Sequence, residues 1–435
     1  MRMYDLILKK RNGDALSKEE LAFIVEHYTN GDIPDYQMSS FLMAVYFQGM
    51  TDEETVALTL AMADSGERLD LSAIHGVKVD KHSTGGIGDK TTLIISPMLA
   101  CLDVPVAKMS GRGLGFTGGT IDKLESIPGF RTALSREEFI QNVNDIKLAI
   151  AGQTANLAPA DKKIYALRDV TGTVEQASLI ASSIMSKKLA SGADVIVLDV
   201  KTGSGAFMQT EEAAEELAKI MVSIGTMAGK KVTAILTDMN EPLGEMVGNA
   251  LEVQEAVQVL KGQGEARLTE VCYTLASYML LGSGKAGSIE EARQRLEKTI
   301  TSGAALKRFA EFVERQGGDA GYILGERQWE QASIIMPVYS KKHGYLSACQ
   351  TNEVGMASLI LGGGRETKES VIDPLVGIRL VKHLGDSVST GEPLAYIYGN
   401  DTAKAEEAKE RLLNAYTISE AAPMMEKVIK QVIEK

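Results

Sequence analysis

The chain has 435 residues, 44% of them hydrophobic and 24% charged, and its formal net charge at pH 7 is −12. This composition is typical of a folded, multidomain protein and excludes a disordered chain. The negative charge argues against nucleic acids and acidic membranes as partners, because basic surfaces bind phosphate backbones. The three cysteines match no zinc or disulfide spacing. We find no signal peptide and no apolar run long enough to span a bilayer, and we expect a cytoplasmic protein.

The first 65 residues are expected to form a small helical layer. Helices are predicted over residues 18–28 and 36–48 and from Thr51 onward, and no strand alternation interrupts them. Capping boxes, in which a hydroxyl and a glutamate exchange hydrogen bonds with the backbone, mark several helix starts along the chain. These boxes are Ser17–Glu20, Thr51–Glu54, Ser135–Glu138 and Ser288–Glu291.

From Gly76 onward, short strand-forming runs alternate with helical stretches. The runs cover residues 77–80, 104–107, 194–200 and 232–237, and residues 211–224 are a typical intervening helix. This alternation predicts an α/β domain with a largely parallel sheet. Residues 174–188 are helical by pattern and are expected to return to the helical layer.

Beyond about Pro337 the pattern changes to short strands at residues 345–347, 377–381 and 394–398, separated by glycine-rich turns. The fold class is therefore α/β with additional domains. We expect a helical domain of residues 1–65 plus 161–192, an α/β domain of residues 76–160 plus 193–335, and a β-rich C-terminal domain of residues 336–435.

Two glycine-rich segments, Lys81–Thr92 and Lys108–Glu125, carry the chemistry. Each follows a predicted strand, which is where open α/β sheets bind ligands. Glycines let backbone N–H groups close around an anion, and both segments add hydroxyls and a lysine. One such loop alone would be interpreted as a tight turn, but two favour an anion site. Neither fits the nucleotide-binding patterns GxxxxGK[ST] or GxGxxG, so a single phosphate or phosphosugar is the predicted ligand.

The second segment contains SGRGLGFTGGTIDKLE (residues 110–125), which resembles the signature of the thymidine and pyrimidine-nucleoside phosphorylases. The motifs KHSTGG (81–86), ALRD (166–169), SSIMSKK (182–188) and DVKTGSGAF (199–207) match the same family in the same order. The resemblance extends from Met1 to the end of the chain. It implies a helical domain, an α/β domain and a C-terminal β-rich part, assembled as a homodimer. In having a lysine at position 108, the sequence is similar to the branch of the family that accepts uridine as well as thymidine.

The activity that the resemblance implies is reversible phosphorolysis. Inorganic phosphate would attack the anomeric carbon of a pyrimidine nucleoside (uridine, thymidine or deoxyuridine) and release the free base, with inversion to an α-pentose-1-phosphate. Phosphate and a pyrimidine nucleoside are thus the expected partners. The phosphate ligands that the resemblance implies are Lys81, Ser83, Thr92, Lys108, Met109, Ser110 and Thr120.

The resemblance places the base between Arg168 and Lys188. Arg168 and Lys187 would stabilise the anionic leaving group, Ser183 shares a helix face with Lys187, and His82 would donate a proton or hydrogen bond to the base. Without the resemblance, Lys187 and Lys188 would be interpreted as a pair complementing the helix dipole, and Lys188 is given no role. The apolar walls implied around the base are Leu114, Tyr165, Ile180 and Phe207, each indistinguishable by itself from a core residue.

A potassium ion is also implied, because bacillar members of the family bind one. The corresponding residues are Gly88, Lys90, Leu243, Met246 and Glu255. The sequence departs from the family at two positions. Phe116 replaces a histidine of the signature, and Lys90 replaces the threonine of GDTTT, so its ammonium group would repel a cation or substitute for it.

Three alternatives stay open at the level of the sequence. The first is a phosphorylase restricted to thymidine. The second is a phosphoribosyltransferase of the anthranilate type, although the sequence offers no acidic pair placed for the two metal ions that its pyrophosphate substrate would need. The third is a non-catalytic sensor of nucleoside or phosphate, with Phe116 and Lys90 as marks of lost activity.

Overall fold

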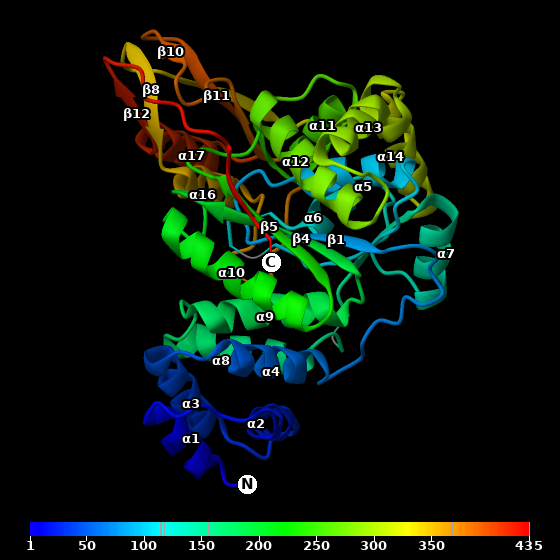
Figure 1. The fold of residues 1–435 in the computed structure, drawn as a ribbon. Coiled ribbons are helices and arrows are strands. Elements are labelled where there is room, and N and C mark those ends of the chain that lie inside the picture. Colours follow the sequence, from blue (N-terminus) through cyan, green and yellow to red (C-terminus); the bar gives the residue numbers. More distant parts are fainter. Residues whose placement is uncertain (114, 117, 155, 368, 435) are drawn as a thin grey trace.

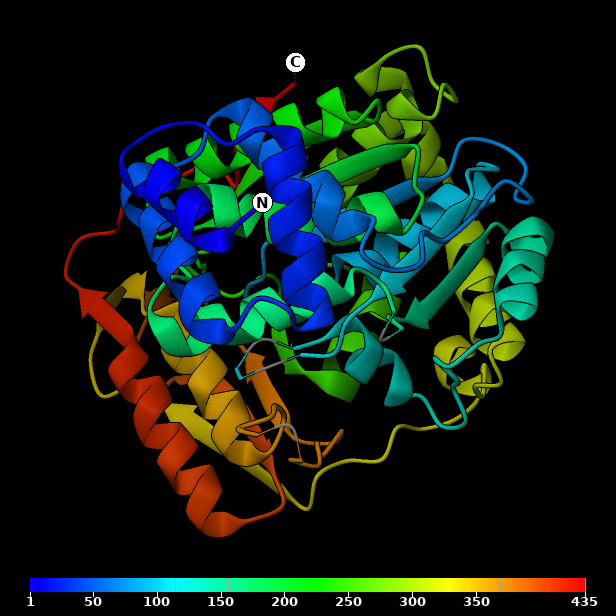
Figure 2. The ribbon, with the colours of Figure 1, turned by 90° about the horizontal axis from the view of Figure 1, so that it is seen from below.

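The computed structural model describes residues 1–434 except 114, 117, 155 and 368. Its parts follow one another from bottom to top in Figure 1, with a helical layer, a central sheet flanked by helices, and a C-terminal part. Figure 2 looks from below, where the helical layer lies toward the viewer and the C-terminal part projects to one side. The predicted fold class is confirmed. Among the described residues, none of the helices combines the length and apolar character that a membrane crossing requires.

The helical layer is built from two separate stretches of the chain. Its core is a cluster of apolar side chains that includes Tyr28, Phe41 and Leu58, with Ile164 and Leu179 contributed by the second stretch. The return of the chain to this layer was predicted for residues 174–188. The helices are α1 (Met3–Arg11), α2 (Lys18–Asn30), α3 (Asp35–Gln48), α4 (Asp52–Ala63), α8 (Pro159–Thr171) and α9 (Ala177–Ala190).

The central sheet has the order β13-β5-β4-β1-β2-β3. Strands β1 to β5 pair in parallel, whereas β13 pairs antiparallel with β5. Residues 429–433, expected in the C-terminal part, therefore lie in this sheet. The strands are β1 (Val79–Ser83), β2 (Val106–Ser110), β3 (Leu148–Gly152), β4 (Val195–Thr202), β5 (Lys231–Asp238) and β13 (Ile429–Ile433).

Helices cover both faces of this sheet, and each face has its own apolar core. On one face α9 and α10 (Glu211–Met227) pack against the sheet and join it to the helical layer (Figure 1). The remaining helices of the α/β part are α5 (Thr91–Cys101), α6 (Thr120–Glu125), α7 (Arg136–Ile146), α11 (Asn249–Leu260), α12 (Ala266–Gly282), α13 (Ile289–Thr301), α14 (Ala304–Arg315) and α15 (Gly321–Leu324).

The C-terminal part combines small sheets with helices. One sheet has the order β6-β9-β11-β7 and the other β10-β8-β12. Since β6 lies between β5 and α11 in the chain, the α/β part contributes an edge strand to this sheet. The elements are β6 (Met246–Gly248), β7 (Ile334–Tyr339), β8 (Gly344–Cys349), α16 (Thr351–Leu361), β9 (Gly377–Leu380), β10 (Ser387–Val388), β11 (Pro393–Gly399), α17 (Thr402–Ala415) and β12 (Tyr416–Ser419). The strands were expected here, but α16 and α17 were not.

The predicted capping boxes form at three of the four helix starts. Ser17, Thr51 and Ser135 each accept a hydrogen bond from the glutamate backbone three residues on, and each glutamate side chain returns one. At the fourth, the hydroxyl of Ser288 accepts from the Glu291 backbone, but the Glu291 carboxylate accepts from the Gly287 N–H instead. This cap is therefore one-sided.

Candidate active site

The two glycine-rich segments meet at one edge of the central sheet. The neighbouring parallel strands β1 and β2 end at Ser83 and Ser110, and each continues into a glycine loop and a helix. Gly85 and Gly88 have φ angles of 100° and 77°, which a side chain rarely tolerates. The first loop leads into α5, where Thr92 lies in the first turn. A helix start of this kind attracts phosphate through its free N–H groups and its dipole.

Lys81 is buried among acidic groups beneath the first loop. Its Nζ lies 2.6 Å from the Thr91 hydroxyl, 3.1 Å from an Asp89 carboxylate oxygen and 3.5 Å from one of Asp199. Burial alone would lower the pKa of Lys81, but these two carboxylates raise it above its usual value. Asp199 is also paired with Lys201 at 2.7 Å. The site therefore holds an ammonium that is charged at neutral pH and lies among oxygen atoms of Thr91, Asp89 and Asp199.

A second buried network lies one residue earlier on β1. Asp80 is bracketed by Lys108 Nζ at 2.9 Å and Lys188 Nζ at 2.8 Å, and Lys108 also donates to the Lys81 carbonyl at 2.5 Å. Burial raises the pKa of Asp80, but the two lysines outweigh it and hold that pKa well below the usual range. Burial and the nearby Lys188 lower the pKa of Lys108 to about 8, although Asp80 opposes them. Lys188, given no role from the sequence, thus supports the strand that carries the site.

His82 follows Asp80 and Lys81 on β1. Burial, followed by the positive charges of Lys188 and Lys108, holds the pKa of His82 well below its usual value. The imidazole is therefore neutral near pH 7, and it can donate one N–H without carrying a positive charge.

The second loop is held by Asp122 on α6. Its carboxylate accepts hydrogen bonds from the Gly113 N–H at 2.7 Å and from Arg365 at 2.8 and 2.9 Å. Arg365 follows α16 in the C-terminal part, and its carbonyl accepts from the Gly115 N–H at 3.0 Å. Thr120 begins α6. Leu114 and Thr117 lie outside the described residues.

Phe116, which stands where the family has a histidine, packs toward the C-terminal core. A Cβ placed on Gly355 of α16 would come within 2.8 Å of the Phe116 ring and 2.5 Å of Ile87. The ring is half-buried against the apolar cluster that includes Ile87 and Val354. The substitution therefore exchanges a polar group at the loop for an apolar contact between the loop and α16.

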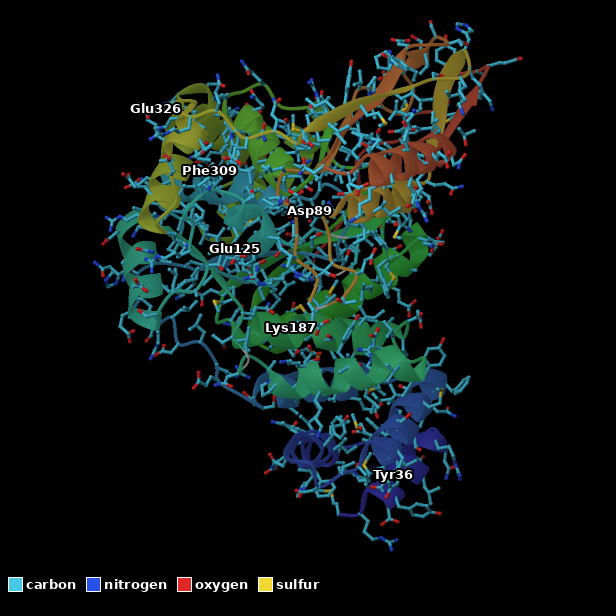
Figure 3. All side chains as sticks on the ribbon, turned by 180° about the vertical axis from the view of Figure 1, so that it is seen from behind. Tyr36, Asp89, Glu125, Lys187, Phe309 and Glu326 are labelled. Carbon is cyan, nitrogen blue, oxygen red and sulfur yellow. The ribbon has the colours of Figure 1, made fainter. Side chains whose placement is uncertain are left out.

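The predicted base site lies on the helical layer. On α9, Lys187 Nζ is 3.2 Å from the Ser183 hydroxyl and 2.5 Å from an Asp161 carboxylate oxygen on α8. Ile180 lies in the core shared by α9 and the sheet. Figure 3 labels Lys187 on this layer and Asp89 in the α/β part above it. Tyr165 and Phe207, the other predicted walls, are exposed.

Arg168 is buried, and its guanidinium is bonded to backbone. It donates to the carbonyls of Thr173 at 3.1 Å, Leu179 at 3.0 Å and Val174 at 2.7 Å. These bonds fix the turn between α8 and α9. In this conformation the guanidinium holds its own helix connection together, so a role at the base stays a prediction.

A hollow of about 950 Å³ lies beside the second loop. Met109, Ser110, Gly111 and Arg112 form one side of it, and residues 67–70 and 151–154 contribute others. The hollow therefore reaches two of the predicted phosphate ligands, Met109 and Ser110. His82 and Lys187 are not among its lining residues in the described part of the chain.

The residues expected around potassium also come together, with the Lys90 ammonium among them. Its Nζ lies 2.8 Å from the Leu243 carbonyl, 2.9 Å from the Met246 carbonyl and 2.5 Å from a Glu255 carboxylate oxygen. Gly88 approaches the same point, where an added Cβ would lie 3.4 Å from Nζ. In the described ranges, no group of three or more His, Cys, Asp or Glu side chains is placed to hold a metal ion.

Comparison with protein families assigns each part of this architecture. Residues 4–66 match the helical bundle domain of a glycosyl transferase family, residues 75–306 match its a/b domain, and residues 345–419 match the pyrimidine nucleoside phosphorylase C-terminal domain. Fold and site thus define a glycosyl-transferring enzyme with a helical bundle and an a/b domain. The solved anthranilate phosphoribosyltransferase of Thermus thermophilus has a similar fold, with a TM-score of 0.57 at 18% identity over 71% of this chain and 98% of that one.

Curated relatives narrow the assignment. The pyrimidine-nucleoside phosphorylase of Geobacillus stearothermophilus is 55% identical over 96% of both chains, and that of Bacillus subtilis is 56% identical over 92% of both. A Staphylococcus aureus relative of the same name is 54% identical over the full length of both chains. The chain belongs to the pyrimidine-nucleoside phosphorylase family.

Proposed function

We propose that this chain catalyses the reversible phosphorolysis of pyrimidine nucleosides (uridine, thymidine and deoxyuridine) to the free base and an α-pentose-1-phosphate. The observation that carries the proposal is the meeting of two glycine loops at one sheet edge, above the charged, buried Lys81. Such an edge suits a phosphate dianion. Family membership supplies the second substrate, since the relatives named above are pyrimidine-nucleoside phosphorylases.

In the reaction a phosphate oxygen attacks C1′ while the bond from C1′ to the base nitrogen breaks. The electron pair of that bond leaves with the base, and the configuration at C1′ inverts. The protein needs to hold phosphate in line and to stabilise the negative charge that develops on the base. No covalent intermediate with the chain is required.

On the phosphate side, the proposal assigns binding to side chains and backbone of the two loops. Bound phosphate would compete with Asp89 and Thr91 for the Lys81 ammonium, and the first turn of α5 would add N–H donors. The proposed phosphate ligands are Lys81, Ser83, Thr92, Lys108, Met109, Ser110 and Thr120.

On the base side, Lys187 and Ser183 would bind the pyrimidine carbonyl oxygens and His82 would donate its neutral N–H. The Lys187 side chain is 27% exposed, and its ammonium is bonded to Asp161 and Ser183. Arg168 reaches the base only if its guanidinium releases a carbonyl of the turn between α8 and α9. Binding of the base would therefore replace protein oxygen atoms by pyrimidine carbonyl oxygens as the hydrogen-bond acceptors of Lys187 and Arg168.

We place the chain in the cytoplasm as a homodimer that associates through its helical layer. Tyr36 and Phe47 on α3 are 73% and 76% exposed, and Tyr4 on α1 is exposed as well. Tyr36 lies at the end of the molecule formed by the helical layer in Figure 3. Exposed aromatic groups of this kind mark association surfaces. Light scattering during gel filtration would measure the mass, and Phe47→Glu should shift it toward the monomer.

The deciding experiment measures the release of uracil from uridine and of thymine from thymidine by ultraviolet difference absorbance, with and without phosphate. We expect turnover of both nucleosides, and none without phosphate. Turnover of thymidine alone would shift the assignment to a thymidine-restricted enzyme. Binding without turnover would favour a sensor, and a requirement for pyrophosphorylated ribose and magnesium would favour a phosphoribosyltransferase.

A further inference from the structure

The buried ammonium of Lys90 lies where a family member would place potassium. The Lys90 side chain has no exposed surface, and its Nζ contacts two carbonyl oxygens and one carboxylate oxygen. An ammonium has three N–H donors and no acceptor. The three oxygens of Leu243, Met246 and Glu255 therefore satisfy it completely.

These residues do not fit an additional monovalent cation. The oxygens that would coordinate the ion are those that already accept from Lys90, and Glu255 is the carboxylate that balances its charge. A second cation would place two positive charges beside one buried carboxylate, which is unfavourable in a medium of low polarity. Gly88 also lies close to these groups, since an added Cβ would lie 2.7 Å from the Leu243 carbonyl oxygen and 3.4 Å from the Lys90 Nζ.

The Lys90 ammonium also makes the connections that a bound ion would make. Lys90 directly precedes α5 and so ends the first glycine loop. Leu243 precedes β6, Met246 is its first residue, and Glu255 lies on α11. Glu255 in turn accepts from the backbone N–H groups of Glu245 at 2.6 Å and Met246 at 2.9 Å. One Nζ therefore joins the phosphate loop, the strand shared with the C-terminal part, and a helix of the α/β part.

A neighbouring lysine holds the same loop from its other side. Lys123 Nζ donates to the Asp89 carbonyl at 2.7 Å and is paired with Glu252 of α11 at 2.7 Å. The Asp89–Lys90 dipeptide is thus fixed by two buried ammonium groups, both paired with carboxylates of α11.

We propose that the Lys90 ammonium is a built-in replacement for the monovalent cation, so that this enzyme folds, binds phosphate and turns over without potassium. The part concerning turnover rests on the proposed phosphorylase function, whereas the part concerning the cation site does not. A threonine at position 90, as in the family motif GDTTT, would leave the two carbonyls and the Glu255 carboxylate free for an ion.

The test compares the parent chain with Lys90→Thr and Lys90→Met in chloride salts of potassium, sodium and tetramethylammonium at one ionic strength. The first readout is the thermal unfolding temperature, because an ion that binds only the native state raises it. We expect no potassium-specific rise for the parent chain. Lys90→Thr should unfold at a lower temperature and regain part of the loss in potassium. Lys90→Met, whose apolar end fills the site, should lose stability without recovery.

The second readout is uridine phosphorolysis with phosphate supplied as its tetramethylammonium salt. The parent rate should differ by less than about twofold between the salts, because matched ionic strength keeps screening constant. A potassium-specific rise in the parent's unfolding temperature, or loss of its activity without potassium, would overturn the proposal. If neither variant folds, the parent chain's own salt series still decides. Absence of turnover in every salt would count against the proposed function and leave the unfolding readout intact.

Discussion

At the scale of single residues, the site is organised by buried charges that neutralise one another. Lys81, Lys108 and Lys188 are matched by Asp80, Asp89 and Asp199. The sequence indicated Lys81 and Lys108 through their place beside the glycine loops. Asp80 carries a weaker signal, since a charged residue on a central strand needs a partner, but nothing in the sequence names Lys188 as that partner. Arg365 could not be predicted, because more than 240 residues separate it from Asp122 in the chain.

The first prediction concerns His82, whose neutral imidazole cannot act as a cationic acid near pH 7. At saturating phosphate, kcat should show no acidic limb with a midpoint near about 6.5, the usual pKa of histidine. His82→Ala should lower kcat by about 10²-fold, the effect of removing one donor to a developing oxyanion. His82→Asn keeps an N–H donor and should retain more activity. An acidic limb that disappears in His82→Asn would contradict this.

The second prediction concerns Lys108, whose pKa is lowered to about 8 by burial and by Lys188. Between that value and the ordinary lysine pKa of about 10.4, the unfolded chain binds more protons than the native one. Stability contributed by this residue therefore rises with pH across the window, by up to ~1.4 kcal/mol per pH unit. Urea unfolding between those pH values measures the slope for the whole chain, and the slope of Lys108→Met should be smaller by the share that Lys108 contributes. If stability depends on pH equally in both proteins, Lys108 does not titrate within this range.

At the scale of elements, strands and helices formed where local patterns were strong. The predicted runs at 77–80, 104–107, 194–200 and 232–237 became β1, β2, β4 and β5. The first three strands lie one to three residues later than predicted, and β5 is one residue longer at each end. Strand β3 was missed because Lys147, the residue that follows α7, has a φ of 62° without being a glycine. The boundary between α7 and β3 thus lacks the glycine that usually marks the end of a helix. Helices α16 and α17 were missed as well.

The third prediction concerns Arg365, which we regard as a positioning residue for the second glycine loop. Arg365→Lys keeps the charge but loses the two parallel hydrogen bonds to Asp122. We expect KM for phosphate to rise about tenfold, or ~1.4 kcal/mol, with kcat less affected. Arg379→Lys is the matched control, since Arg379 is exposed and 3.8 Å from its partner Glu245. Equal effects of the two substitutions on KM would contradict a positioning role of Arg365 for the second glycine loop.

At the scale of the whole molecule, the proposed phosphate and base ligands come from different parts of the chain. The connections between these parts are expected near residues 66–76 and 155–163, and described residues of the two ranges are in contact. The Glu67 N–H donates to the Asn156 carbonyl at 3.1 Å. Ala158, just before α8, has a φ of 49°, which is unfavourable for a residue with a side chain. This pairing of the two connections depends on tertiary structure, so only their approximate positions could be predicted from the sequence.

The fourth prediction is that these connections form a hinge that closes when phosphate and base bind. Crystals with both ligands should show a smaller angle between the helical layer and the α/β part than crystals without them. A Cβ on Gly66 would lie 2.1 Å from the Asn156 carbonyl and 2.4 Å from Pro159, so Gly66→Ala should change kcat and KM together. Gly287→Ala, where an added Cβ would come no closer than 3.3 Å to a side-chain oxygen, is the control. Identical angles in both crystal forms would contradict closure.

Strand β13 has a consequence for how the molecule is made. Its partner β5 leaves the ribosome long before it, because residues 239–428 are synthesised between the two strands. Throughout that interval the outer edge of β5 presents unpaired N–H and carbonyl groups, which can pair with other chains. A premature stop before residue 429 would make this exposure permanent. Nascent chains of this protein are therefore most in need of a chaperone during the translation of their C-terminal part.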